Sequence, residues 1–238
     1  MKLPKGTQLR IARSPFSTDW CDRWFNSFQA LAWDRPQVKG RALNRRTAWY
    51  VRGRCTCTYD YGAMQIKPRG FPVWLDDLMD IVMPQCWLLD RQGWPTSCNV
   101  NYYEQHGDMV GAHADNEDLF QGTKQEITII SLSLGGTREF LIYTAARQPL
   151  GSVLLRNGDM IAMENWTQAQ LKHGIAKLPL GSLEDPKRIN FTWRWIAQHK
   201  LDCPEEEQRT ISGPAALPIK DEVLPADEAE QNWASKRG

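Results

Sequence analysis

The sequence predicts an α+β fold in which an antiparallel β-sandwich or barrel is supported by N-terminal helices. Two observations carry this prediction. Before Cys98, apolar residues recur at helical spacing. From Cys98 onward, short β-branched and apolar segments alternate with turn residues. Several short strands that follow helical segments are typical of such a sandwich or barrel.

Two helices are expected in the N-terminal part. The first covers residues 14–33, where the Ser-Thr-Asp run at 17–19 can cap the helix. Its large side chains recur at helical spacing and are interpreted as a core-facing stripe; they are Trp20, Trp24, Phe25, Phe28 and Leu31. The second helix covers residues 73–83 and is bounded by a proline on each side.

Five strand-like segments follow, at residues 126–134, 152–156, 159–163, 171–178 and 188–196. The Asn157-Gly158 pair lies between the second and the third of them. Asn-Gly between apolar runs is the strongest short-range signal for a β-hairpin. We therefore expect residues 152–156 and 159–163 to pair with each other.

Charge is unevenly distributed along the chain. The sequence has 29 basic and 28 acidic side chains, for a formal net charge of +1. Residues 202–238 hold nine acidic and four basic groups, which is −5 and leaves +6 on residues 1–201. We expect a single folded domain over 1–201 and a solvated, largely disordered acidic tail over 202–238.

The positive charge is concentrated in residues 35–59, which contain no acidic residue. Basic side chains alternate there with aromatic ones; they are Arg35, Lys39, Arg41, Arg45, Arg46, Arg52 and Arg54, with Trp49, Tyr50 and Tyr59. Such a segment is suited to binding phosphates and stacking on bases. The alternative is a solvated loop whose charge has no function.

Six cysteines stand at positions 21, 55, 57, 86, 98 and 203. The chain is neither small nor visibly secreted, so a disulfide framework is not expected. Cys55-x-Cys57 is one residue tighter than the usual paired zinc-binding spacing, and no second pair follows. We expect reduced, mostly buried thiols and a cytoplasmic or nuclear location. No apolar run is long enough for a spanning helix.

The segment His113-Ala114-Asp115 places an imidazole and a carboxylate on the same side of an extended chain. A further histidine, His173, begins a later strand-like stretch. Two imidazoles and one carboxylate form the facial triad that binds non-haem Fe(II) and leaves positions open for other ligands. The alternative is a buried, hydrogen-bonded His113 and a capping Asp115.

The segment 188–195 alternates strictly as a strand. Arg188, Asn190, Thr192 and Arg194 share one face, and the other face is apolar. Arginines on an inward face require anions, because a buried unpaired charge is very costly. A dicarboxylate cosubstrate would supply them, since arginine binds carboxylates bidentately. Asn101 and Tyr103, on one face of another strand, would complete that pocket.

Together these motifs resemble the AlkB family of Fe(II)- and 2-oxoglutarate-dependent dioxygenases. The residues that carry the resemblance are Asn101, Tyr103, His113, Asp115, His173, Arg188, Asn190 and Arg194, with Thr47-Ala48-Trp49-Tyr50 and Tyr59-Asp60-Tyr61 upstream. The resemblance covers about residues 40–197. It implies a double-stranded β-helix (jelly-roll) core at about 98–197, N-terminal helices and a nucleotide-recognition lid at about 40–70.

The resemblance also implies roles for individual residues. His113, Asp115 and His173 would bind iron. Arg188, with Tyr103 and Asn190, would hold the distal carboxylate of 2-oxoglutarate, and Arg194 and Asn101 its other end. With O2 as co-reactant, the reaction would oxidise a methyl group on a base nitrogen, giving formaldehyde, succinate and CO2.

Substrate contacts are also implied. Tyr61 would stack on a flipped base opposite His113, Tyr59 would hydrogen-bond nearby, and Glu117 would contact the exocyclic amino group. For the tyrosines the alternative is ordinary strand packing. Arg45, Arg46 and Trp49 are further substrate-binding candidates.

The expected substrate is alkylated DNA, with lesions such as 1-methyladenine and 3-methylcytosine, acted on by a monomer without a membrane partner. Three alternatives stay open: an RNA demethylase, a non-catalytic nucleic-acid-binding module, and a hydroxylase of proteins or small molecules.

Overall fold

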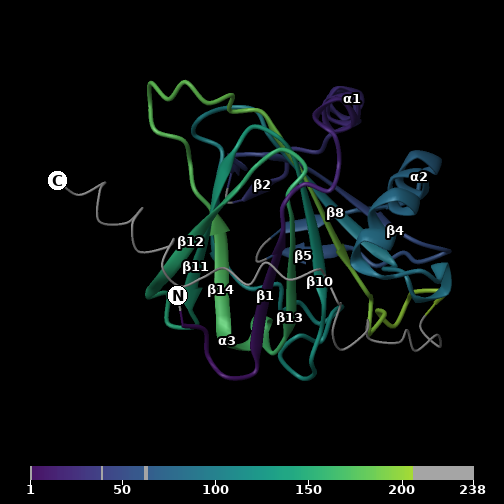
Figure 1. Ribbon diagram of the computed structural model, residues 1–238. Helices are drawn as coiled ribbons and strands as arrows, with labels where there is room; N and C mark the ends of the chain where they lie inside the picture. The colour runs from purple at the N-terminus through teal and green to yellow at the C-terminus, as the bar shows by residue number, and fades with distance from the viewer. Residues whose placement is uncertain (1, 39, 62–63, 206–238) are drawn as a thin grey trace.

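The computed structural model describes residues 2–38, 40–61 and 64–205, and it has the expected jelly-roll core (Figure 1). The larger sheet has the strand order β1-β13-β10-β15-β8-β4-β7, in which only β4 and β7 are parallel. Its strands are β1 (Thr7–Ala12), β4 (Arg46–Val51), β7 (Pro68–Gly70), β8 (Ser97–Tyr103), β10 (Ile129–Gly135), β13 (Met160–Asn165) and β15 (Arg188–Arg194).

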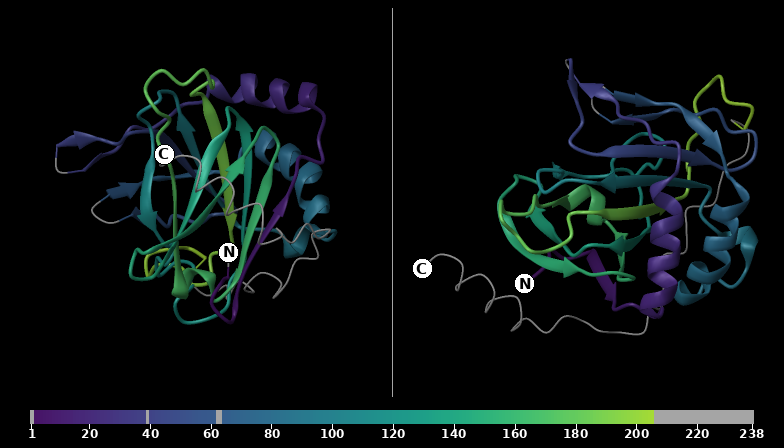
Figure 2. Two further views of the ribbon diagram at one scale, coloured as in Figure 1. Left: turned by 60° about the vertical axis from the view of Figure 1, so that its left-hand side comes forward. Right: turned by 90° about the horizontal axis from the view of Figure 1, so that it is seen from above.

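The smaller sheet has the order β12-β11-β14-β9 and is antiparallel throughout. Its strands are β9 (Val110–His113), β11 (Arg138–Thr144), β12 (Pro149–Leu155) and β14 (Leu171–Ile175). Two short ribbons complete the strands, β2 (Gln37–Val38) with β3 (Arg41–Ala42), and β5 (Tyr59–Tyr61) with β6 (Met64–Ile66). Both ribbons project from the side of the molecule opposite the helices (Figure 2, left).

Helices α1 (Thr18–Gln29) and α2 (Val73–Val82) lie side by side against the outer face of the larger sheet (Figure 2, right). The first begins at Thr18 and not at residue 14, because the Ser17 side chain caps it, accepting a hydrogen bond from the backbone nitrogen of Trp20 at 3.2 Å, and it ends at Gln29 and not at residue 33. A 3-10 turn at Met83–Cys86 continues past the expected end of α2. Two shorter pieces are a 3-10 turn at Arg91–Gly93 and α3 (Thr167–Gln170).

The larger sheet separates two hydrophobic clusters, as a two-faced strand requires. Leu132 and Phe191 face the helices, where they pack with Phe28 and the buried side of α2. Ile129 and Met163 belong to the second cluster, together with side chains of the smaller sheet. The polar residues of β15 lie on this second face, so the sandwich encloses a polar pocket next to an apolar core.

The prediction that residues 152–156 and 159–163 pair as a hairpin around Asn157-Gly158 is wrong. Strand β12 pairs with β11 in the smaller sheet, whereas β13 pairs with β1 and β10 in the larger one. The turn is held by β10 instead: Gly158 N donates to Ser133 O at 2.7 Å, and Asn157 Oδ1 accepts from Gly135 N at 2.9 Å. These bonds direct the chain across the sandwich rather than back along its own strand.

The described chain continues past residue 201. Cys203 and Glu205 are buried against the body, and Glu205 Oε1 accepts a hydrogen bond from the backbone of Arg54 at 2.9 Å. The rest of the acidic segment, residues 206–238, lies outside the described residues. Among the residues described, no helix has the length and apolar character needed to cross a membrane.

Replacing Gly158 with alanine should destabilise the fold by about 2–4 kcal/mol. Alanine is strained in the left-handed backbone conformation of this residue, and its added methyl group would overpack the turn. Its φ is +85°, and a Cβ would lie 2.1 Å from Ser14 Oγ and 2.7 Å from Cys21 Sγ. Urea unfolding measures the change. Gly107→Ala is the matched control, since a Cβ there meets nothing within 4 Å. Equal stability of the two variants would contradict the packing described for this turn.

Candidate active site

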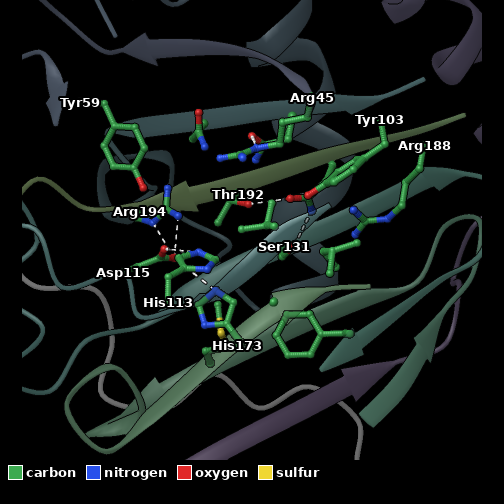
Figure 3. Close-up of a pocket in the computed structure, with 18 residues that line it drawn as sticks. Arg45, Tyr59, Tyr103, His113, Asp115, Ser131, His173, Arg188, Thr192 and Arg194 are labelled. Atoms are coloured by element: carbon green, nitrogen blue, oxygen red, sulfur yellow. Dashed lines mark hydrogen bonds and ion pairs between the residues drawn. The ribbon is translucent and has the colours of Figure 1, made fainter. Parts of the chain in front are cut away.

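Two strands of the smaller sheet bring the predicted triad together (Figure 3). His113 ends β9, Asp115 follows two residues later, and His173 lies opposite His113 in β14. One nitrogen or oxygen from each of the three side chains lies within 4.8 Å of the others. The strands approach closely here because residue 174 is glycine: a Cβ on Gly174 would lie 2.6 Å from Val110 O.

The polar atoms of the triad are oriented as metal ligands. His113 Nδ1 lies 2.9 Å from Gly111 O, and since a carbonyl only accepts, Nδ1 carries the proton and Nε2 presents a lone pair. That Nε2 lies 3.4 Å from Asp115 Oδ1, a buried oxygen without a hydrogen-bond partner among the residues that the structure describes. His173 Nε2 lies 4.0 Å from Asp115 Oδ2. Lone pairs that face one another in this way fit a divalent cation between them.

A buried arginine fixes Asp115. Nε and Nη2 of Arg194 both donate to Asp115 Oδ2, at 3.1 and 2.6 Å. Burial by itself would raise the pKa of Asp115, but the positive charge of Arg194 outweighs burial and holds the pKa well below its usual range. Burial, reinforced by His113, lowers the pKa of His173 to about 3. A charged Asp115 and a neutral His173 are the forms of these two side chains that bind metal.

Arg188 lies at the opposite end of the pocket from Asp115 (Figure 3). Its side chain is buried, with Nη2 donating to Ser133 Oγ at 2.8 Å and Cζ 5.2 Å from the ring centroid of Tyr103. Its Nε and Nη1 have no hydrogen-bond partner among the described residues. A buried guanidinium with two unused donors fits a carboxylate ligand. The pocket between the two ends has an empty volume of about 510 Å³, including its open mouth.

The alternation predicted for residues 188–195 is confirmed. Arg188, Asn190, Thr192 and Arg194 line the pocket, whereas Ile189, Phe191 and Trp193 pack under the helices. Asn190 Nδ2 donates to Ser131 Oγ at 2.6 Å, and Asn190 Oδ1 accepts from Thr192 Oγ1 at 3.0 Å. This network holds the floor of the pocket in one arrangement.

Arg194 and Arg45 differ from the sequence-based expectations. Arg194 is committed to Asp115 through two of its nitrogens, which leaves only Nη1 for another ligand. Arg45 is buried and donates from Nε to Asn101 Oδ1 at 2.8 Å, so it lines the interior pocket and is not part of an outer phosphate-binding surface.

Trp49 requires a second correction. Its side chain is fully buried, its Nε1 donates to Cys57 O at 2.9 Å, and its ring stacks on Tyr59 with the centroids 5.0 Å apart. Trp49 therefore supports Tyr59 from behind and does not itself reach the pocket.

Tyr59 and Glu117 lie beside the triad. Tyr59 lines the pocket, Arg194 Cζ lies 5.6 Å from its ring centroid, and Tyr59 and Glu117 hydrogen-bond to each other. Burial and then the charge of Asp115 raise the pKa of Glu117 to about 7. Tyr61 lies in β5, but its side chain is outside the described part of the structure.

Much of the positive charge in residues 35–59 is neutralised by ion pairs. Arg46 pairs with Glu104 at 2.7 Å, Arg52 with Asp76 at 2.7 Å, and Arg54 with Glu205 at 3.8 Å. Lys39 lies outside the described residues. The net charge of the sequence segment therefore overstates the charge that this surface offers to phosphates.

Some supporting residues were not predicted as site residues. Gln168 Oε1 accepts from the backbone nitrogen of Asp115 at 2.9 Å, and Ser133 contacts Arg188. Arg138 is fully buried, with Cζ 5.7 Å from the ring centroid of Tyr103. The sequence around Gln168 and Arg138 does not indicate these contacts. For Ser133, the alternation of residues along its strand places it, with Ser131, on the pocket face.

His113→Ala should abolish binding of a divalent cation and leave the fold intact, because it removes a ligand without exposing a buried charge. Titration with Mn²⁺, an iron substitute that does not oxidise in air, measures the loss. His106→Ala, outside the triad, is the matched control and should bind normally. Asp115→Ala is a poorer test, since an uncompensated Arg194 would cost about 3–5 kcal/mol of stability. Normal Mn²⁺ affinity in His113→Ala would refute the metal assignment.

Comparison with known proteins agrees with this geometry. A family model described as the 2OG-Fe(II) oxygenase superfamily matches residues 9–194. A solved chain described as the structure of OsALKBH1 aligns over 82% of this chain and all of its own length, with a TM-score of 0.54 and 19% identity. That likeness concerns the fold.

Two curated relatives carry demethylase names. The chain is 26% identical over 177 residues to the tRNA demethylase abh1 of Schizosaccharomyces pombe, covering 71% of this chain and 55% of the relative. It is 28% identical over 111 residues to the DNA N(6)-methyladenine demethylase ALKBH1D of Arabidopsis thaliana, covering 42% and 24%.

A third match is the RNA-directed RNA polymerase of Lolium latent virus, 29% identical over 119 residues, covering 50% of this chain and 6% of that protein. The chain thus spans about half or less of the curated relatives it matches. With a matching family model over most of its length and the triad in place, the chain belongs to the 2OG-Fe(II) oxygenase superfamily, as an AlkB-type member that uses Fe(II), 2-oxoglutarate and O2.

Proposed function

We propose that this protein oxidatively demethylates alkylated bases in nucleic acid. One observation carries the proposal: a single pocket joins a triad suited to Fe(II) with a buried arginine, Arg188, whose Nε and Nη1 have no hydrogen-bond partner in the described part of the chain. A cation site at one end and a carboxylate site at the other match the two ends of 2-oxoglutarate.

Each cofactor contact is assigned to described residues. His113, Asp115 and His173 hold the iron, which when bound activates O2 with 2-oxoglutarate as the reductant. Arg188, with Tyr103 and Asn190 beside it, binds the distal carboxylate. Asn101 and the remaining Nη1 of Arg194, which also line the pocket, are assigned to the other end of the cosubstrate.

The overall reaction balances. One oxygen atom of O2 enters 2-oxoglutarate, which loses CO2 and becomes succinate. The other is inserted into a C–H bond of the N-methyl group. The resulting cationic N-hydroxymethyl base releases formaldehyde, the hydroxyl proton passes to solvent, and the ring nitrogen of 1-methyladenine or 3-methylcytosine recovers its lone pair. The protein excludes water from the reaction and orients the methyl group towards the metal site. The buried walls of the pocket provide both functions.

Tyr59 and Glu117 are the proposed contacts to the base. Glu117 hydrogen-bonds to Tyr59 beside the pocket, and a carboxylate is suited to accept a hydrogen bond from an exocyclic amino group. Flipping a base into the pocket costs a few kcal/mol and least for a damaged pair. We place 1-methyladenine and 3-methylcytosine in DNA first, and a location in the cytoplasm or nucleus follows from such a substrate.

RNA is the second candidate substrate. It is favoured by the match to abh1, a protein named for tRNA, which covers most of this chain. The partly neutralised basic segment indicates that phosphate contacts are few, so affinity for either polymer should depend on the flipped base more than on total charge.

Arg188→Met should weaken 2-oxoglutarate binding by about 10-fold to 100-fold, because it removes charge-assisted hydrogen bonds to the distal carboxylate. Mn²⁺ binding should not change. Anaerobic titration of the manganese-loaded chain with 2-oxoglutarate measures the effect. Arg46→Met, at the surface ion pair with Glu104, is the control. Unaltered 2-oxoglutarate affinity in Arg188→Met would place the cosubstrate elsewhere.

A panel of methylated oligonucleotides, single- and double-stranded, DNA and RNA, tests the function itself. Formaldehyde and succinate should be released together from substrates with 1-methyladenine or 3-methylcytosine, and His113→Ala should release neither. Turnover on RNA alone would reverse the ranking of the two polymers. A chain that binds metal and 2-oxoglutarate but demethylates none of these substrates would contradict the proposed function.

A further inference from the structure

A second group of metal-binding side chains lies outside the iron triad. Cys55 and Cys57 lie in the segment between β4 and β5, and His199 and Cys203 follow β15. The first pair and the second pair are far apart in the sequence: Cys55 and His199 are separated by 144 positions. One ligand atom from each of the four residues nevertheless lies within 4.8 Å of every other. The sulfur atoms of Cys55, Cys57 and Cys203 lie 3.5, 3.7 and 3.3 Å from His199 Nδ1.

These separations match the edges of a metal tetrahedron. Bonds of about 2.3 Å from zinc to sulfur and 2.0–2.1 Å to nitrogen require sulfur–nitrogen edges of about 3.6 Å. The three measured edges, 3.3 to 3.7 Å, surround that value. The three thiols are buried and unpaired by disulfides. Three sulfurs and one imidazole nitrogen therefore enclose a volume that fits one ion.

Backbone amides support each sulfur separately. Cys57 N donates to Cys55 Sγ at 3.5 Å, Lys200 N to Cys57 Sγ at 3.2 Å, and Thr56 N to Cys203 Sγ at 3.5 Å. Hydrogen bonds of this kind stabilise negative charge on sulfur and orient it, as outer-shell contacts do at metal sites. A buried thiol that merely fills space behaves as a small hydrophobic group and requires no such donors.

We propose that Cys55, Cys57, His199 and Cys203 bind a structural zinc ion. Three thiolates and one imidazole in a closed tetrahedral set favour zinc over the oxygen-seeking cations. All four positions are filled by protein, so this ion has no open site for chemistry. The short Cys-x-Cys spacing is accommodated because the other two ligands come from a different part of the chain.

The zinc ion has a definite structural role. It joins the segment that leads into Tyr59 to the segment that leaves β15, the strand that carries Arg188 and Arg194. Lys200 Nζ pairs with Asp60 Oδ2 at 2.6 Å and so joins the same two parts of the chain. Trp49 Nε1, in β4, donates to Cys57 O and ties the Cys55–Cys57 segment to the larger sheet. Zinc thus holds the wall of the pocket around Tyr59 against the sheet.

The test measures the metal content of the reduced full-length chain after expression with zinc. About one zinc ion per chain is expected, as for a closed site with four protein ligands. The zinc should remain in His113→Ala, which disables the iron triad, and should be lost in Cys203→Ser. Cys86→Ala, a buried thiol outside the cluster, is the matched control and should keep its zinc.

Cobalt(II) added alone to the metal-free chain gives a second reading, because thiolate ligation produces intense near-ultraviolet absorption. Cys203→His preserves four donors and should bind cobalt with weaker thiolate absorption, which separates loss of a ligand from loss of folding. A folded wild-type chain with neither zinc nor thiolate–cobalt absorption would overturn the proposal. So would an iron–sulfur cluster, copper or a disulfide at these residues. None of these results depends on whether the chain demethylates nucleic acid.

Discussion

The buried ion pair between Asp115 and Arg194 is the interaction on which the site depends. Arg194 belongs to β15 of the larger sheet, and Asp115 follows β9 of the smaller one, so the pair connects the two layers of the sandwich. Removing either partner would leave an uncompensated buried charge, at a cost of about 3–5 kcal/mol. The pair also explains how a carboxylate can be held charged and oriented, with Oδ1 near His113 Nε2 and Oδ2 near His173 Nε2.

The parts of the site that the sequence predicted are those governed by local periodicity. The alternation of residues 188–195 determines which side chains share a face, because successive residues of a strand point in opposite directions. The spacing of His113 and Asp115 works in the same way. The hairpin prediction at Asn157-Gly158 failed because turn residues specify a change of direction but not the partner strand. Here the turn's backbone groups bond to β10, and the flanking strands join different sheets.

Features that depend on long-range contacts were not predictable. Nothing near Trp49 in the sequence shows that Tyr59 and Phe120 cover it. The ion pairs that neutralise Arg46 and Arg52 involve acidic residues well beyond the basic segment. The cysteine cluster is the clearest case: its spacing argued against metal binding, and only the fold brings His199 and Cys203 to the Cys-x-Cys pair. If zinc occupies it, the wall that carries Tyr59 is fixed independently of the catalytic metal.

The most direct test of the account is an anaerobic crystal structure of the chain with Mn²⁺ and 2-oxoglutarate. The account predicts manganese bound by Nε2 of His113, Nε2 of His173 and a carboxylate oxygen of Asp115, with the distal carboxylate of 2-oxoglutarate on Nε and Nη1 of Arg188. It would be contradicted by manganese bound away from this triad, or by a 2-oxoglutarate whose carboxylates leave Arg188 without a partner.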